Sequence, residues 1–106
     1  MRNLSAVELK NHLEQADPAP LLLDVREPWE YQRVHLPNSD LIPMRQIPMA
    51  LSNLDQQQEI VVICHHGIRS RQVAIFMENY GFSNIINLHG GIDAWAREID
   101  PTMALY

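Results

Sequence analysis

The chain's only cysteine, Cys64, stands where a predicted strand meets a predicted helix. Residues 60–63 are consecutive β-branched apolar residues, as in a fully buried strand of a parallel sheet. From Ser70 to Tyr80, apolar residues recur at helical spacing. The carboxyl end of a strand and the amino end of a helix form the place where open α/β sheets bind ligands and where free N–H groups favour an anion. We therefore predict that Cys64 is a thiolate nucleophile in a backbone cradle built for an anionic substrate.

The loop after Cys64 contains residues that suit this cradle. A free thiol is only a few per cent ionised at neutral pH, so a nucleophilic cysteine needs nearby positive potential. The following helix offers its positive end, and Arg69, with His65 or His66, supplies local charge. Gly67 permits a positive φ, which lets the backbone curl around a bound group. The alternative interpretation is an inert, buried cysteine that serves as a small apolar residue.

A single cysteine also limits the chemistry. It excludes an intramolecular disulfide and a two-cysteine redox mechanism. If Cys64 forms a covalent intermediate, a second substrate or a partner protein must resolve it.

Strands and helices alternate along the chain, which predicts one α/β domain over residues 1–106 with a mainly parallel sheet. A helix follows the capping box of Ser5 and Glu8, and a second begins near Pro28. Gly81 is placed to end the central helix, and residues 101–106 are expected to form a loosely held tail. The predicted strands are residues 21–25, 40–42, 60–63 and 84–88, with short helical turns at 44–51 and a last helix from Ile92.

A mixed-charge cluster lies at the carboxyl end of the strand at residues 21–25. It consists of Asp24, Arg26 and Glu30. One interpretation is a polar rim of the Cys64 site; the other is a hydrogen-bonded brace that holds the loop.

Composition narrows the possible partners. The 106 residues carry a net charge of −5, with 46% apolar and 20% charged residues, which is an ordinary globular composition. A general nucleic-acid-binding role is therefore not expected. The first residues lack the apolar run of a signal peptide and no stretch is long enough to cross a membrane, so a cytoplasmic location is expected.

Three segments together resemble the single-domain rhodanese family. Residues 64–74, continuing to residues 80–82, resemble its active-site loop and helix. Residues 23–31 with 35–37 resemble its first signature, and residues 90–95 its last one. The segments occur in the family's order and cover most of the chain. Val34, Asn38 and Ser39 stand where the family often has glycine, glycine and alanine.

This resemblance implies an open sheet of about five strands with helices on both faces, and a sulfurtransferase cycle. Cys64 would take the outer sulfur of thiosulfate or a similar anionic donor as a persulfide, and a thiol or cyanide would accept it. A sulfur-relay protein is a further expected partner, and no cofactor is implied. Backbone N–H groups of the loop would stabilise the persulfide, and Ser70 would open the helix. The implied substrate-binding residues are His65, His66, Gly67, Ile68, Arg69 and Ser70.

Three alternatives remain open from the residues. A cysteine phosphatase or arsenate reductase needs a Cys-x5-Arg loop, whereas Cys64 and Arg69 give Cys-x4-Arg. A metal site is not expected, because neighbouring His65 and His66 rarely converge on one ion without other ligands. His65 and His66 are expected instead to narrow the pocket in favour of small anions. The third alternative is a rhodanese-like interaction or regulatory module without turnover.

Overall fold

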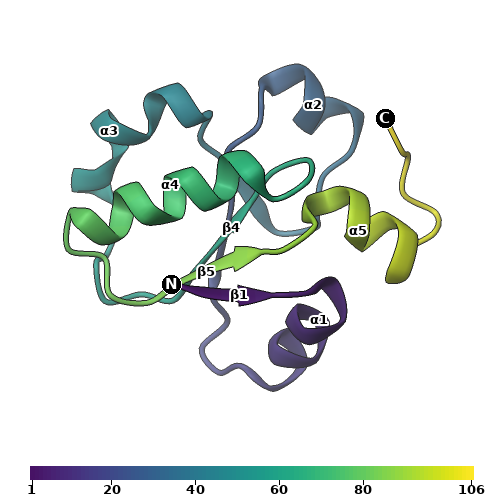
Figure 1. The fold of residues 1–106 in the computed structure, drawn as a ribbon, viewed down its shortest axis with the longest axis horizontal. Coiled ribbons are helices and arrows are strands. Elements are labelled where there is room, and N and C mark those ends of the chain that lie inside the picture. The colour runs from purple at the N-terminus through teal and green to yellow at the C-terminus, as the bar shows by residue number, and fades with distance from the viewer.

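The strand before Cys64 lies at the centre of the sheet. The computed structural model describes residues 1–106, and β4 (Ile60–Ile63) is the middle strand of a sheet ordered β1-β5-β4-β2-β3. All neighbouring strands run parallel (Figure 1). The other strands are β1 (Arg2–Leu4), β2 (Leu21–Asp24), β3 (Ser39–Leu41) and β5 (Ile85–Leu88). Five parallel strands confirm the predicted fold class, and the carboxyl ends of β2, β4 and β5 meet at one edge.

Helices cover both faces of this sheet, as predicted (Figure 1). Alternate residues of β4 divide between two cores, with Ile60 and Val62 in one and Val61 and Ile63 in the other. The first core lies against α3 (Ile47–Ala50) and α4 (Ile68–Asn79), and the second against α1 (Ala6–Gln15) and α5 (Gly91–Glu98). Because β4 is buried on both sides, the position of the residue that follows it is closely defined.

Most predicted elements are present. The capping box is formed, with Glu8 N–H donating to Ser5 Oγ and the Glu8 carboxylate accepting from Ser5 N–H. Short helical turns follow Pro43, namely η1 (Met44–Gln46), α3 and η2 (Leu51–Asn53), and α2 spans Pro28–Arg33. Asn38 has a φ of +64°, the left-handed conformation for which glycine is favoured. No helix is both long and apolar enough to span a membrane.

Three local expectations were wrong or incomplete. The first strand, β1, was missed because its residues are polar or half-exposed; it forms by pairing with buried β5. The helix α4 begins at Ile68, so Ser70 is its third residue and does not open it. Residues 101–106 are not a loosely held tail, because the chain returns from α5 to α2, where Tyr106 packs against Trp29 (Figure 1).

Candidate active site

The backbone of the Cys64 loop turns sharply at Gly67. This residue caps α4 with a φ of +95°, a conformation that side-chain-bearing residues rarely adopt. A Cβ at this position would lie 3.0 Å from Gly90 N and 3.2 Å from Leu88 O. The absence of a side chain at Gly67 therefore permits the turn, and it also lets the segment that follows β5 pack directly against the loop.

The turn directs two backbone N–H groups at the sulfur. Gly67 N–H donates to Cys64 Sγ at 3.1 Å, and Ser70 N–H donates to it at 3.3 Å. Ser70 is the third residue of α4, so the sulfur accepts the N–H that an N-cap side chain would otherwise take. Cys64 is 1% exposed, and its sulfur lies beneath the loop with these amides facing it. The inward N–H groups are what the predicted cradle requires, whereas the burial of Cys64 is what the alternative of an inert, buried cysteine predicts. The nucleophilic role of Cys64 therefore stays a prediction.

A chain of buried polar groups continues from the sulfur into the sheet. Cys64 Sγ donates to Ser70 Oγ at 3.2 Å, and Ser70 Oγ donates to Asn87 Oδ1 at 2.5 Å. Asn87 Nδ2 then donates to Asn3 Oδ1 at 2.9 Å. Asn87 was not predicted as a site residue. Its signal in the sequence is a polar residue within the apolar run of β5, which requires a buried partner.

The histidines lie at the rim of the loop. The His65 ring is half-buried between Tyr106, at a centroid distance of 3.8 Å, and His66, at 3.9 Å. Burial and the neighbouring His66 lower the pKa of His65, so its ring is held mainly neutral at pH 7. His66 and Ile68 are exposed, Ile68 at 70%. The Ile68 side chain therefore points away from the sulfur.

Arg69 was expected to supply local positive charge to the cradle; it is charged, but it is held in an ion pair. Its two terminal nitrogens donate to the Glu30 carboxylate at 2.7 and 3.0 Å. The Glu30 hydrogen bonds raise the pKa of Arg69, which stays charged. Burial would raise the pKa of Glu30, but hydrogen bonds from Arg69, Glu27 N–H and the Tyr106 hydroxyl lower it to about 2. The loop cation is thus held by a charge partner from α2.

The cluster after β2 is the hydrogen-bonded brace, as one of its two interpretations predicted. Arg26 is fully buried and donates to both carboxylate oxygens of Asp24, at 2.8 to 3.1 Å. It also donates to Val34 O and to the Tyr106 hydroxyl. Burial opposes a charged Arg26, yet the Asp24 hydrogen bonds outweigh it and raise its pKa. Tyr106 joins this brace to the loop through its stack on His65, and no local sequence pattern marked it.

The loop is also fastened to α5. Ile92 N–H donates to Cys64 O at 2.8 Å, and Asp93 N–H donates to His65 O at 3.0 Å. Gly91 makes this approach possible, since a Cβ there would lie 2.3 Å from His65 O. His65, His66 and Asp93 consequently form the group of side chains that could hold a metal ion.

Comparisons with known proteins point to one family. A model of the rhodanese-like domain matches residues 5–98. The chain is 36% identical over 84 residues to "Sulfurtransferase" of Allochromatium vinosum, covering 79% of this chain and 78% of that protein. It is 36% identical over 101 residues to "Putative sulfurtransferase YtwF" of Bacillus subtilis, covering 95% and 96%.

A solved structure shares the fold. The rhodanese-like domain protein from Staphylococcus aureus matches with a TM-score of 0.82 and 34% identity, over 90% of this chain and 91% of that one. Its likeness extends over nearly the whole sheet and its helices. The chain therefore belongs to the rhodanese-like domain family.

Proposed function

We propose that the protein is a sulfurtransferase in which Cys64 carries the transferred sulfur. The Cys64 thiolate attacks the outer sulfur of thiosulfate or a similar anionic donor. A sulfur–sulfur bond forms to Cys64 as the bond to the sulfonate sulfur breaks, and sulfite leaves with the electron pair. A thiol or cyanide then attacks the outer persulfide sulfur and releases the Cys64 thiolate.

One observation carries this proposal, namely the convergence of Gly67 and Ser70 N–H groups on Cys64 Sγ. Preorganised backbone donors stabilise negative charge on sulfur at no cost of reorganisation during the reaction. Family membership supports the same chemistry, since both relatives compared above carry the name sulfurtransferase.

Access to the sulfur favours small donors. Because Cys64 is 1% exposed, a donor reaches it only when the residues over it move apart. His65 and His66 belong to the loop that covers the sulfur, and their rings stack with that of Tyr106. We infer that this ring stack borders the route of the donor. We expect thiosulfate to react faster than bulky donors, and the His66→Ala variant to reduce this preference.

A phosphatase is the enzymatic alternative that the geometry disfavours. Such enzymes grip a phosphoryl group with a bidentate arginine. Here both terminal nitrogens of Arg69 already donate hydrogen bonds to the Glu30 carboxylate. A binding module without turnover stays as the second alternative, and it predicts no covalent change at Cys64.

Mass spectrometry after thiosulfate treatment tests the proposal. The intact protein should gain the mass of one sulfur atom, and a thiol or cyanide should remove it. Cys64→Ala should gain none. Ser39→Ala is a suitable control, because Ser39 is a buried serine that donates to Leu36 O, away from the sulfur.

The same samples are assayed with a phosphate ester. Absence of a sulfur adduct on folded protein would overturn the proposal in favour of the binding module. Phosphate-ester turnover without sulfur transfer would overturn it in favour of the phosphatase.

A further inference from the structure

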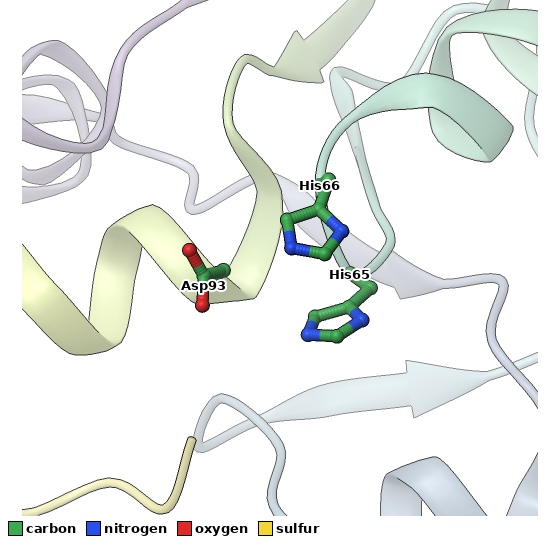
Figure 2. Close-up of side chains that lie close together, drawn as sticks. All are labelled: His65, His66 and Asp93. Carbon is green, nitrogen blue, oxygen red and sulfur yellow. The ribbon is translucent and has the colours of Figure 1, made fainter. Parts of the chain in front are cut away.

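Three side chains from two elements gather at the rim of the Cys64 loop. Figure 2 shows the rings of His65 and His66 one above the other, with the Asp93 side chain beside them on the first turn of α5. One ligand atom of each lies within 4.8 Å of those of the other two. Backbone hydrogen bonds from Ile92 and Asp93 to Cys64 and His65 hold the two elements together. The proximity therefore does not depend on the three side chains themselves.

One ring nitrogen in this group lacks a partner. His65 Nε2 is buried and makes no hydrogen bond, the only buried side-chain nitrogen or oxygen of the protein in that state. A buried polar atom without a partner generally destabilises a fold, so such atoms usually have a function or a missing ligand. Asp93 uses Oδ2 to accept from Arg97 Nε at 3.0 Å, which leaves Oδ1 free.

The ligand atoms of this group suit a cation. A neutral imidazole offers the lone pair of one ring nitrogen, and a carboxylate offers two acceptor oxygens. Two imidazoles and one carboxylate are ligands that zinc accepts, whereas magnesium and calcium prefer oxygen alone.

We propose that His65, His66 and Asp93 form a zinc site beside the Cys64 loop, with water in the remaining coordination position. The sequence alone did not indicate it, because adjacent histidines need a third ligand from elsewhere. The fold supplies that ligand through the docking of α5 against the loop.

Zinc binding requires one local movement. The two imidazole rings are stacked at a centroid distance of 3.9 Å with an interplanar angle of 29°, and the ligand atoms lie within 4.8 Å of one another. A tetrahedral ion would bring its ligand atoms to roughly 3.4 Å from one another, at bond lengths of about 2.1 Å. His66 is exposed, so its ring can turn toward the ion, while the Tyr106 stack holds His65 in place.

Calorimetric titration of metal-free protein with zinc chloride tests this proposal. Cys64→Ser is the background, because it removes the only thiol that could bind zinc. We expect one zinc per chain, with Asp93→Asn and His66→Gln each weakening the affinity at least tenfold. His12→Gln is the matched control, since His12 pairs with a carboxylate elsewhere, at 2.6 Å from Glu59. It should leave the affinity unchanged.

NMR of the histidine rings gives a second readout that does not depend on the folding of the variants. Zinc should shift the ring signals of His65 and His66 and leave those of His12, His35 and His89 in place. Absence of stoichiometric binding, or binding that is insensitive to Asp93→Asn, would overturn the proposal, as would shifts confined to the other histidines. Neither measurement uses turnover, so the outcome is independent of the proposed sulfur transfer.

Discussion

Two strand-to-helix junctions stand side by side at one edge of the sheet and differ in how their polar groups are used. After β2, Asp24 and Arg26 satisfy each other in a buried ion pair, and further donors of Arg26 are taken by Val34 O and Tyr106. After β4, the Gly67 and Ser70 N–H groups converge on a single sulfur. The first junction is closed by its own side chains, whereas the second directs its donors at a reactive atom.

The difference follows from the residue type at each junction, with Asp24 as the last residue of β2 and Cys64 as the first residue after β4. An aspartate accepts hydrogen bonds strongly and fixes an arginine, which completes a structural brace. A cysteine sulfur accepts hydrogen bonds only weakly, so the Gly67 and Ser70 N–H groups can still stabilise the negative charge of a thiolate or a persulfide. Glu30 connects the two junctions, because it binds Arg69 of the loop and the Tyr106 hydroxyl of the brace.

The largest expected effect comes from removing the buried Asp24–Arg26 ion pair at the end of β2. Asp24→Asn leaves the Arg26 charge buried without its partner, and it should lower the free energy of unfolding by about 3–5 kcal/mol. Urea unfolding measures this change. The double variant Asp24→Asn with Arg26→Met should recover part of the loss, because it removes the unpaired charge.

The rate of persulfide formation in these two variants shows whether the brace takes part in the reaction. Under conditions in which each variant is folded, its rate should stay close to that of the unaltered protein. A rate that falls while stability recovers in the double variant would show that the brace takes part in the reaction.

Local patterns predicted most of the fold. The buried run at residues 60–63, the capping box at Ser5 and the prolines near 43 and 48 each act over a few residues, and each produced its expected element. The position of Cys64 at a strand-to-helix junction was predictable for the same reason. The edge strand β1 was not, because it depends on pairing with β5, more than 80 residues later.

The missing parts of the site are also long-range. Asn3 meets Asn87 across 84 residues, and Tyr106 meets Glu30 across 76. Arg69 was predicted as a charge near the sulfur, but its pairing with Glu30 needs the relative placement of α2 and α4. Residue type indicates what a side chain can bind, whereas only the assembled fold decides which partner it reaches.

Two glycine variants test the junction after β4, whose N–H groups point at the Cys64 sulfur. Gly67→Ala and Gly81→Ala both force an alanine to a φ near +95°, at a general cost of about 1–2 kcal/mol. At Gly81 the added Cβ meets only the flexible Gln56 side chain, at 3.3 Å. At Gly67 it meets backbone, Gly90 N at 3.0 Å, so the loop and its N–H group must shift.

Gly67→Ala should therefore slow persulfide formation by roughly 10²-fold, the usual effect of losing one preorganised donor. Gly81→Ala should lose stability and keep the rate. Stopped-flow measurement of sulfite release distinguishes the two. Equal slowing in both variants would attribute the effect to general strain.

Removing the hydroxyl beside the sulfur should have a smaller effect. In Ser70→Ala the backbone N–H stays, but Sγ loses its contact with Ser70 Oγ, and Asn87 Oδ1 loses its donor. Once Cys64 is a thiolate it has no proton to donate, so the Ser70 hydroxyl must turn from Asn87 Oδ1 to donate to the sulfur. A hydrogen bond to a charged group contributes about 1.5 kcal/mol or more, so without this hydroxyl the persulfide-forming rate should fall roughly tenfold. Ser39→Ala removes a buried hydroxyl outside the site and should leave the rate unchanged. A rate unaffected by Ser70→Ala would mean that the backbone donors suffice.

A pH-dependent effect tests the link between the two junctions, which Glu30 provides. Arg69, Glu27 N–H and Tyr106 outweigh burial and hold the pKa of Glu30 at about 2, below its ordinary value of 4.5. In this interval the unfolded chain binds more protons than the folded one, so the stabilisation from Glu30 is present above pH 4.5 and is lost as the pH falls through about 2. The stability difference between the unaltered protein and Glu30→Gln should be constant at neutral pH and shrink toward pH 2. Glu14→Gln, which alters an exposed pair with Lys10, is the control for general acid effects. A difference that persists unchanged to pH 2 would contradict an ionised Glu30 as the group that ties the brace to the loop.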